Sequence, residues 1–216
     1  FVLLVLRLWM TTVERAPLRA AGWNWRRRSG LWLALGIAVS ALTVVMVYAI
    51  LPATGPVRDD SLPGGEEDAV LFSALLIIYY LGLAFVQQSL PEELLFRGWL
   101  LWRLRDRPVL AITVTTLVFT AIHLVSQGGQ QSIAEHVLYL ALPLGFSLLA
   151  VGLLLWTGSL WAAVGVHGGF HVGNYIAVAA MPEVDAVSSW LAIGGVQAVI
   201  GIVLTVGALR CGRGIV

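Results

Sequence analysis

The sequence predicts an all-α protein, a polytopic bundle of about six transmembrane helices. Composition is the first observation: 59% of the 216 residues are apolar, 12% are charged, and the mean hydropathy is +0.88. These values are far from those of a soluble domain. The second observation is that apolar runs long enough to cross a bilayer recur along the chain. The third is that arginines and acidic residues gather on different loops, as they do on the two sides of membrane proteins.

Each predicted crossing is an apolar run of roughly 20 residues, the length that spans a bilayer core. The runs occupy residues 31–51, 69–90, 109–125, 137–156, 160–180 and 190–209. We expect the second helix to continue through the apolar stretch 94–102, because a proline such as Pro91 can kink a membrane helix without ending it. Residues 1–10 are too short to cross, so we expect a fragment with a truncated first helix. We expect no cleavable signal peptide.

The chain is expected to form one domain with three parts. Residues 1–68 hold a partial helix, a basic segment, the first full crossing and an acidic loop, with residues 52–68 as a solvated connector. Residues 69–180 form the core that carries the ionisable motifs, and residues 181–216 supply the C-terminal transmembrane helix. The single cysteine, Cys211, can form neither an internal disulfide nor a cysteine metal cluster.

Charge placement predicts the orientation in a cell membrane. Every cation is an arginine, and ten of the 13 arginines form three clusters: Arg15, Arg19 and Arg26 to Arg28; Arg103, Arg105 and Arg107; Arg210 and Arg213. The other loops carry Asp59, Asp60, Glu66, Glu67, Asp68, Glu183 and Asp185 against Arg58 alone. Because arginine favours the cytoplasmic side, we expect both ends of the chain to be cytoplasmic. The basic residues are interpreted as topology signals that face anionic lipid, and a nucleic-acid partner is not expected.

The first chemical motif is Pro91-Glu-Glu-Leu-Leu-Phe-Arg97. Helical spacing puts Glu93 and Arg97 one turn apart, so Arg97 can hold Glu93 ionised. Glu92 projects about 100° away and is free to face a cavity as a general base. The alternative is that all three residues form a structural ion pair or an interfacial charge cluster.

Two further motifs place histidines inside apolar helices. Phe119 and His123 lie one turn apart, so the ring can pack on the imidazole and limit its rotamers. His167 and His171 repeat that spacing, beside glycines that let a neighbouring helix approach closely: Gly165, Gly168 and Gly169. The histidine pair fits interhelical hydrogen bonding, catalysis or metal ligation. Because ionisable groups at membrane depth are costly, we expect these motifs to meet in one wet cavity.

Counting residues along each helix gives an expected depth for the site. At about 1.5 Å per residue, Glu92 is roughly 16 Å from Arg103 and His167 about 14 Å from Gly158. These two heights agree and predict a site in the cytoplasmic half of the membrane. His123 is about 24 Å from Arg107 by the same count, which is too deep unless its helix begins late or tilts.

The ordered motifs Glu-Glu-x-x-x-Arg, Phe-x-x-x-His and Gly-Ser-Leu-Trp leading into His-x-x-x-His resemble the CPBP family. These are the CAAX-type prenyl endopeptidases and bacteriocin-processing enzymes, also called the Abi family of intramembrane proteases. The resemblance covers residues 69–180 and implies an intramembrane endopeptidase that works near the cytoplasmic membrane face. It implies that Glu92 activates water, that His123 helps to hold it, and that Glu93 and Arg97 shape the site.

By the same resemblance, His167 and the residue four positions later donate to the oxyanion of the tetrahedral intermediate. The family usually has asparagine at that later position, whereas this chain has His171, so donation there depends on tautomer and protonation. Asn174 lies about 60° away on a straight helix and is an imperfect substitute. Zinc is left open as a cofactor. Its candidate ligands are Glu92, His123, His167 and His171, but the chain has no His-Glu-x-x-His motif.

The expected partners are a peptide or protein substrate at the membrane and the lipid bilayer itself. The competing function is a catalytically inactive immunity or scaffold protein that keeps the charged residues for structure. A proton-coupled transporter also places Glu and His in the membrane, but no inverted repeat is visible. The arginine-only composition, rich in alanine and glycine, indicates a high-GC bacterial gene and argues against prenylated substrates.

Overall fold

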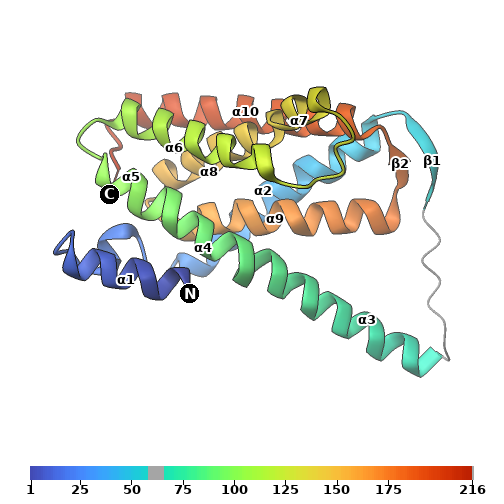
Figure 1. The fold of residues 1–216 in the computed structure, drawn as a ribbon, viewed down its shortest axis with the longest axis horizontal. Helices are drawn as coiled ribbons and strands as arrows, with labels where there is room; N and C mark the ends of the chain where they lie inside the picture. The colour runs from blue at the N-terminus through green and yellow to red at the C-terminus, as the bar shows by residue number, and fades with distance from the viewer. Residues whose placement is uncertain (58–65, 216) are drawn as a thin grey trace.

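Helices dominate the structure, and the all-α fold class is confirmed (Figure 1). The computed structural model describes residues 1–57 and 66–215. Within those residues, five helices are long and apolar enough to cross a membrane: Ser29–Ile50, Phe72–Arg103, Pro108–Val125, Ile133–Thr157 and Ala186–Arg210. The chain is therefore a multi-pass membrane protein, and five of the six expected crossings are found.

The elements follow one another with short connections. In chain order they are α1 (Val2–Thr12), the 3₁₀ turn η1 (Leu18–Ala21), α2 (Ser29–Ile50), β1 (Ala53–Val57), α3 (Glu66–Leu81), the π-helical η2 (Gly82–Ser89), α4 (Leu90–Glu93), the π-helical η3 (Leu94–Leu100), α5 (Leu101–Arg103), α6 (Pro108–Ile122), the 3₁₀ turn η4 (His123–Val125), α7 (Ile133–Tyr139), α8 (Ala141–Thr157), α9 (Leu160–Ala180), β2 (Pro182–Val184) and α10 (Ala186–Arg210).

The sixth expected crossing, residues 160–180, is the helix α9, but it is less apolar than the other five. It carries His167, His171 and Asn174. Most of its first half is buried, and α2, α8 and η2 pack around it. Protein rather than lipid therefore surrounds its polar groups, which is how a bundle tolerates ionisable side chains at this depth.

Glycines let the helix pairs α2–α9 and α8–α10 approach until their backbones touch. A Cβ built on Gly169 would lie 2.6 Å from the Cα of Ile37, and one on Gly194 would lie 2.9 Å from the amide nitrogen of Leu142. Gly168 faces the Phe85 ring on η2 instead. The glycines beside His167 therefore bring both α2 and the glutamate-bearing helix close to it, as the sequence predicts.

Gly194→Ala should destabilise the bundle, because its new methyl group meets the backbone of α8, which cannot give way like a side chain. Overpacking of this kind costs about 1–3 kcal/mol. We expect a lower thermal unfolding temperature in detergent, measured by tryptophan fluorescence. The matched control is Gly195→Ala, whose methyl group has nothing within 4 Å. Equal unfolding temperatures for the two variants would contradict close packing of α8 on α10.

The segments α3 to α5 form one long helix that crosses the bundle diagonally (Figure 1). The expected continuation of the second crossing through residues 94–102 is therefore confirmed. Two π-helical stretches flank Pro91, and the Leu90 N–H bonds the carbonyl of Phe85, five residues back. A proline removes one helical hydrogen bond and crowds the carbonyl four residues earlier, so a widened turn relieves the strain.

The expected connector after α2 is partly wrong, because Ala53–Val57 is a strand. It pairs antiparallel with β2, with Ala53 opposite Val184 and Val57 opposite Pro182. The Thr54 hydroxyl also donates to the Glu183 carbonyl at 3.2 Å. These strands join the ends of α2 and α9 and mark one end of the bundle. The expected acidic loop residues Asp59 and Asp60, and Arg58 beside them, lie outside the described residues.

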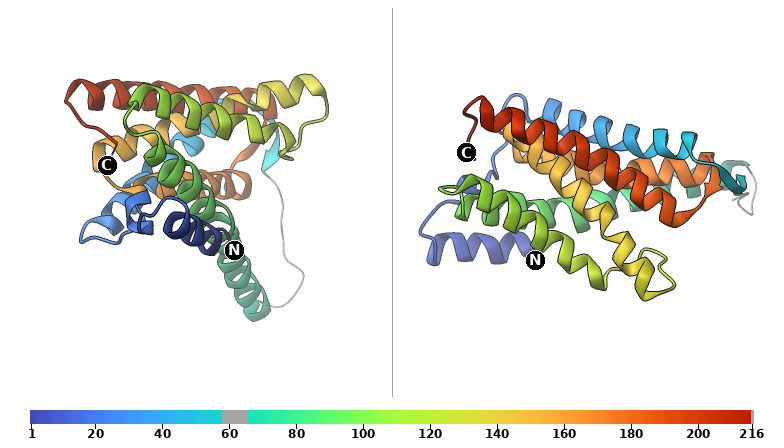
Figure 2. Two further views of the ribbon diagram at one scale, coloured as in Figure 1. Left: turned by 60° about the vertical axis from the view of Figure 1, so that its left-hand side comes forward. Right: turned by 90° about the horizontal axis from the view of Figure 1, so that it is seen from above.

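The segments that carry the three arginine clusters, residues 15–28, 103–107 and 210–213, lie at the end of the bundle opposite the strands (Figure 2). The Trp161 indole donates to the Asn24 carbonyl at 2.6 Å, and the Arg213 guanidinium donates to the Trp156 carbonyl. Glu14 accepts from Trp99 at 3.1 Å and pairs with Arg103 at 3.3 Å. The end of the bundle that carries these arginine clusters is called the basic end below, and the end that carries β1 and β2 is called the strand end.

Candidate active site

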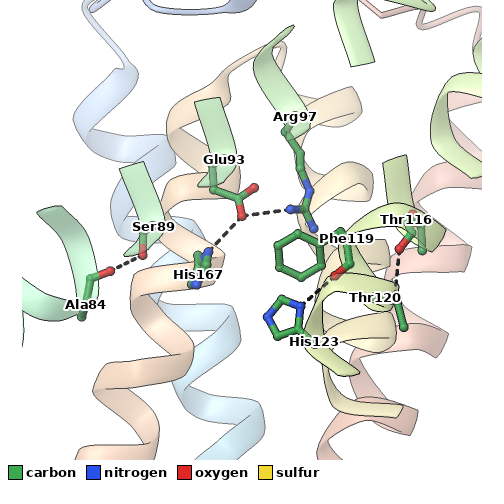
Figure 3. Close-up of polar contacts among 9 residues, drawn as sticks. All are labelled: Ala84, Ser89, Glu93, Arg97, Thr116, Phe119, Thr120, His123 and His167. Atoms are coloured by element: carbon green, nitrogen blue, oxygen red, sulfur yellow. Dashed lines mark hydrogen bonds and ion pairs between the residues drawn. The ribbon is translucent and has the colours of Figure 1, made fainter. Parts of the chain in front are cut away.

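Glu93 lies at the centre of a buried hydrogen-bonded chain formed by Arg97, Glu93 and His167, which is called the charge chain below. Its Oε1 accepts from Arg97 Nη1 at 3.1 Å and from His167 Nδ1 at 3.0 Å (Figure 3). Glu93 is fully buried and Arg97 is 2% exposed. An ionised carboxylate can only accept, so His167 donates from Nδ1, and its Nε2 remains for other partners. The helical spacing predicts the Glu93–Arg97 pair, whereas the bond to His167 needs the fold.

Phe119 holds the charge chain and His123 together. Its ring lies 4.6 Å from the His123 ring and 6.3 Å from the His167 ring, centroid to centroid. The Arg97 guanidinium carbon stands 4.1 Å over the same ring, a cation–π contact that partly replaces water around the charge. Phe119 is completely buried, so it forms a fixed wall.

His123 is oriented by the backbone of its own helix. Its Nδ1 lies 2.7 Å from the Phe119 carbonyl, which accepts the proton (Figure 3). In the neutral ring this arrangement leaves the lone pair on Nε2. His123 follows the last residue of α6, where the helix gives way to a 3₁₀ turn, and the imidazole therefore stands at the helix end rather than inside it.

His171 stacks on His167, with ring centroids 5.3 Å apart and planes at 23°. Its Nε2 is buried and has no hydrogen-bond partner within the described protein. The described cavity that His171 lines does not include Asn174 in its wall, so the nearby asparagine does not stand in for the family's usual residue.

One cavity of about 320 Å³ collects four of the six candidate site residues. Glu92, His123, His167 and His171 line it, while Glu93 and Arg97 lie behind its wall. The remaining lining residues are Gln88, Ser126, Gln127, Tyr139, Leu142, Pro143, Phe146 and Phe170. The volume lies within the range of small-molecule and substrate pockets.

Several buried polar atoms around this cavity have no partner within the described protein. They are Glu92 Oε2, Glu93 Oε2 and His171 Nε2. A buried polar atom without a hydrogen bond costs stability, so such atoms mark where water or a ligand binds. Two of the three belong to residues that line the cavity. Unpaired polar atoms of Glu92 and His171 thus belong to residues that line one cavity, where a water molecule or polar ligand would be stabilised.

The cavity reaches the end of α6 that is remote from the arginine clusters, and the expected depth in the membrane stays a prediction. Ser126 and Gln127 follow the end of α6 that is remote from Arg107, and Tyr139 packs on Trp190 near the start of α10. Phe146 of α8 also lines the cavity. Because α3 to α5 cross the bundle diagonally, equal numbers of residues along two helices do not correspond to equal depths in the membrane.

The four candidate zinc ligands do not form a metal centre in this arrangement. Among the described residues, no group of three or more His, Cys, Asp or Glu side chains is placed to hold a metal ion. Zinc requires four converging ligands, or three and an open position.

Sequence reasoning missed most of the cavity wall. Phe146 and Phe170 are ordinary apolar residues of α8 and α9, and no pattern separates them from other core residues. Gln88 and Gln127 are exposed glutamines. Tyr139, next to a helix end, gave the best available signal, because its polar tip suits a boundary between core and water.

One segment of the chain matches a known protein family. The family model described as type II CAAX prenyl endopeptidase Rce1-like matches residues 72–173. Residues 72–173 are Rce1-like. The recognition of the CPBP family is therefore confirmed, and this Rce1-like segment holds every candidate site residue from Glu92 to His171. The family is a protease family, which supports a peptidase at that level. No match to the chain was found among curated proteins or solved structures.

Proposed function

We propose that this protein is an intramembrane endopeptidase that hydrolyses a peptide bond with water activated by Glu92. One observation carries the proposal: a carboxylate oxygen without a protein partner shares one cavity with three imidazoles. A scaffold protein would have no need to leave these groups facing a common space. The Rce1-like match over residues 72–173 supports the same class of reaction.

The first step is attack by water. Glu92 removes a proton from a water molecule, and the oxygen attacks the carbonyl carbon of the peptide bond. His123 presents the Nε2 lone pair to the cavity because its Nδ1 is bound to the Phe119 carbonyl, so it can accept from the same water. Two acceptors therefore orient the nucleophile, and Phe119 keeps the imidazole in place.

The second step needs donors to the oxyanion and a proton for the leaving amine. His167 and His171 supply donors from Nε2, which in His167 requires a ring protonated on both nitrogens. Glu93 accepts from Nδ1 and stabilises that cationic ring, as a carboxylate orients the histidine of a catalytic triad. When the carbon–nitrogen bond breaks, protonated Glu92 returns its proton to the amine.

The experiment that tests this function uses the purified full chain in phosphatidylcholine vesicles with a pool of hydrophobic peptides extracted from host-cell membranes. Mass spectrometry compares the fragments made by wild type and by Glu92→Gln. Fragments that require the carboxylate identify an endopeptidase. The absence of fragments from both samples, relative to vesicles without the protein, would instead support the inactive scaffold.

We further propose that the cavity opens on the extracytoplasmic side, with the termini in the cytoplasm. The basic end carries the arginine clusters, which favour the cytoplasm, and the cavity wall includes residues at the far end of α6. This proposal differs from the expectation of catalysis near the cytoplasmic face, and it is supported by the cavity residues Ser126 and Gln127, which follow the end of α6 remote from Arg107.

Cysteine labelling tests the orientation without any substrate. The only native cysteine, Cys211, is exposed near the basic end. In intact spheroplasts, a membrane-impermeant maleimide should label Gln127→Cys in a Cys211→Ser background. It should label Cys211 of the wild type only after the membrane is disrupted. The reverse pattern would place the cavity mouth in the cytoplasm.

A further inference from the structure

A second cavity, of about 190 Å³, lies at the basic end on the other side of Arg97. Three arginines line it: Arg19, Arg26 and Arg97. The other lining residues are Ala20, Ala21, Gly22, Asn24, Gly98, Trp102, Leu154, Gly158, Ser159, Leu160, Gly214 and Ile215. None of these described residues is acidic, so the cavity gathers positive charge without a counter-charge of its own.

The walls of this cavity are fixed by specific contacts. Gly98 lets η1 lie against η3, because a Cβ there would stand 2.6 Å from the Ala21 carbonyl oxygen. The chain turns at Gly22 with φ of 78°, a conformation that favours glycine. The Trp161 indole then holds the next segment through the Asn24 carbonyl. Arg19 and Arg26 are therefore carried on an anchored loop beside Arg97.

The buried guanidinium of Arg97 is only partly satisfied. Nη1 donates to Glu93, but Nε and Nη2 have no hydrogen-bond partner within the described protein. Arg97 is 2% exposed, and it lines this cavity rather than the catalytic one. Within residues 1–57 and 66–215, neither Arg19 nor Arg26 takes part in an ion pair. The cavity thus combines unpaired cationic groups with a buried donor.

We propose that this cavity binds a phosphate-bearing anion. Guanidinium groups bind phosphate through paired, charge-assisted hydrogen bonds, and three of them suit a group with several acceptor oxygens. At ~30 Å³ per water, the volume equals roughly six waters, which admits a phosphate group but not a folded partner. Trp102 in the wall and Trp161 beside it place the cavity at headgroup depth, so the phosphate can belong to a lipid headgroup or be free in solution.

Binding here would act on the catalytic cavity through Arg97, since the same guanidinium holds Glu93, which in turn holds His167. This consequence rests on the proposed function, whereas binding itself does not. The experiment therefore measures binding of phosphate and not cleavage. An absence of binding would not count against the proposed hydrolysis.

The test is thermal unfolding of the full chain, followed by tryptophan fluorescence. Inorganic phosphate is titrated in dodecyl maltoside micelles, whose headgroup carries no phosphate, and the same micelles with added phosphatidylglycerol are compared in a separate arm. Wild type should be stabilised by at least one of the two. The double variant Arg19→Gln/Arg26→Gln should lose that stabilisation, with affinity reduced on the order of 100-fold for two charge-assisted contacts.

The matched control is Arg27→Gln/Arg28→Gln, which removes the same charge from neighbouring exposed residues that do not line the cavity. It should respond like wild type. Stabilisation by phosphate alone identifies a soluble phosphate ligand, and stabilisation by phosphatidylglycerol alone identifies a lipid headgroup. An unchanged unfolding temperature in both arms, an equal effect of chloride at matched ionic strength, or an equal loss in both double variants would overturn the proposal.

Discussion

Glu92→Gln should reduce peptide cleavage by at least about 100-fold while leaving the bundle folded. Loss of a general base typically costs 10²–10⁴-fold in rate. The amide has the shape of the carboxylate, and Glu92 Oε2 has no partner within the described protein, so little structural contact is lost. The measurement is the initial rate of fragment formation in vesicles, with the helix content by circular dichroism as the folding check.

Gln88→Glu is not a suitable control for Glu92→Gln, because it adds a charge to the same cavity wall. The control variant is Gln87→Ala. Gln87 is next to Gln88 but lies outside the cavity lining, so this variant should cleave like wild type. If Glu92→Gln keeps the wild-type rate, Glu92 is not the base and the reading of the cavity as an active site fails.

Glu93→Gln should have the largest effect on stability. It leaves the Arg97 charge buried without its carboxylate partner, and breaking one side of a buried ion pair costs about 3–5 kcal/mol. It also replaces the charged acceptor that holds His167 Nδ1 at 3.0 Å by a neutral amide oxygen, which accepts a weaker hydrogen bond. We expect a lower free energy of unfolding in mixed micelles and a loss of cleavage in whatever fraction remains folded.

The double variant Glu93→Leu/Arg97→Met separates stability from catalysis. Apolar residues of similar volume often replace a buried ion pair without loss of stability. We therefore expect this variant to unfold near the wild-type midpoint and still not to cleave, because His167 has lost its orienting carboxylate. A double variant that is as unstable as Glu93→Gln would show that the pair is not the source of the instability.

The sequence predicts the helices well because hydrophobic length is a local property. The crossing expected at 109–125 is found as Pro108–Val125, and that at 190–209 as Ala186–Arg210. The one crossing that falls short in apolarity, α9, is the one that carries two histidines and an asparagine, and its polar residues are tolerated because other helices cover it. The local hydropathy of a segment does not indicate which other helices will bury it.

The site was predictable in its residues but not in its position. The one-turn spacings of Glu93 with Arg97 and of Phe119 with His123 give contacts that the structure contains. The bond from His167 to Glu93 joins residues 74 positions apart and depends on how α9 meets the tilted helix. The helix that carries Glu92 and Glu93 also has π-helical stretches on both sides of Pro91, and spacing at 3.6 residues per turn does not anticipate them.

The most direct measurement is cleavage in water enriched in oxygen-18. If Glu92 delivers a water oxygen to the peptide carbonyl, the new C-terminal carboxylate of each fragment gains one heavy oxygen, and Glu92→Gln yields almost no labelled fragment. Labelled fragments formed equally fast by Glu92→Gln, or fragments whose new carboxylate carries no label, would contradict the account.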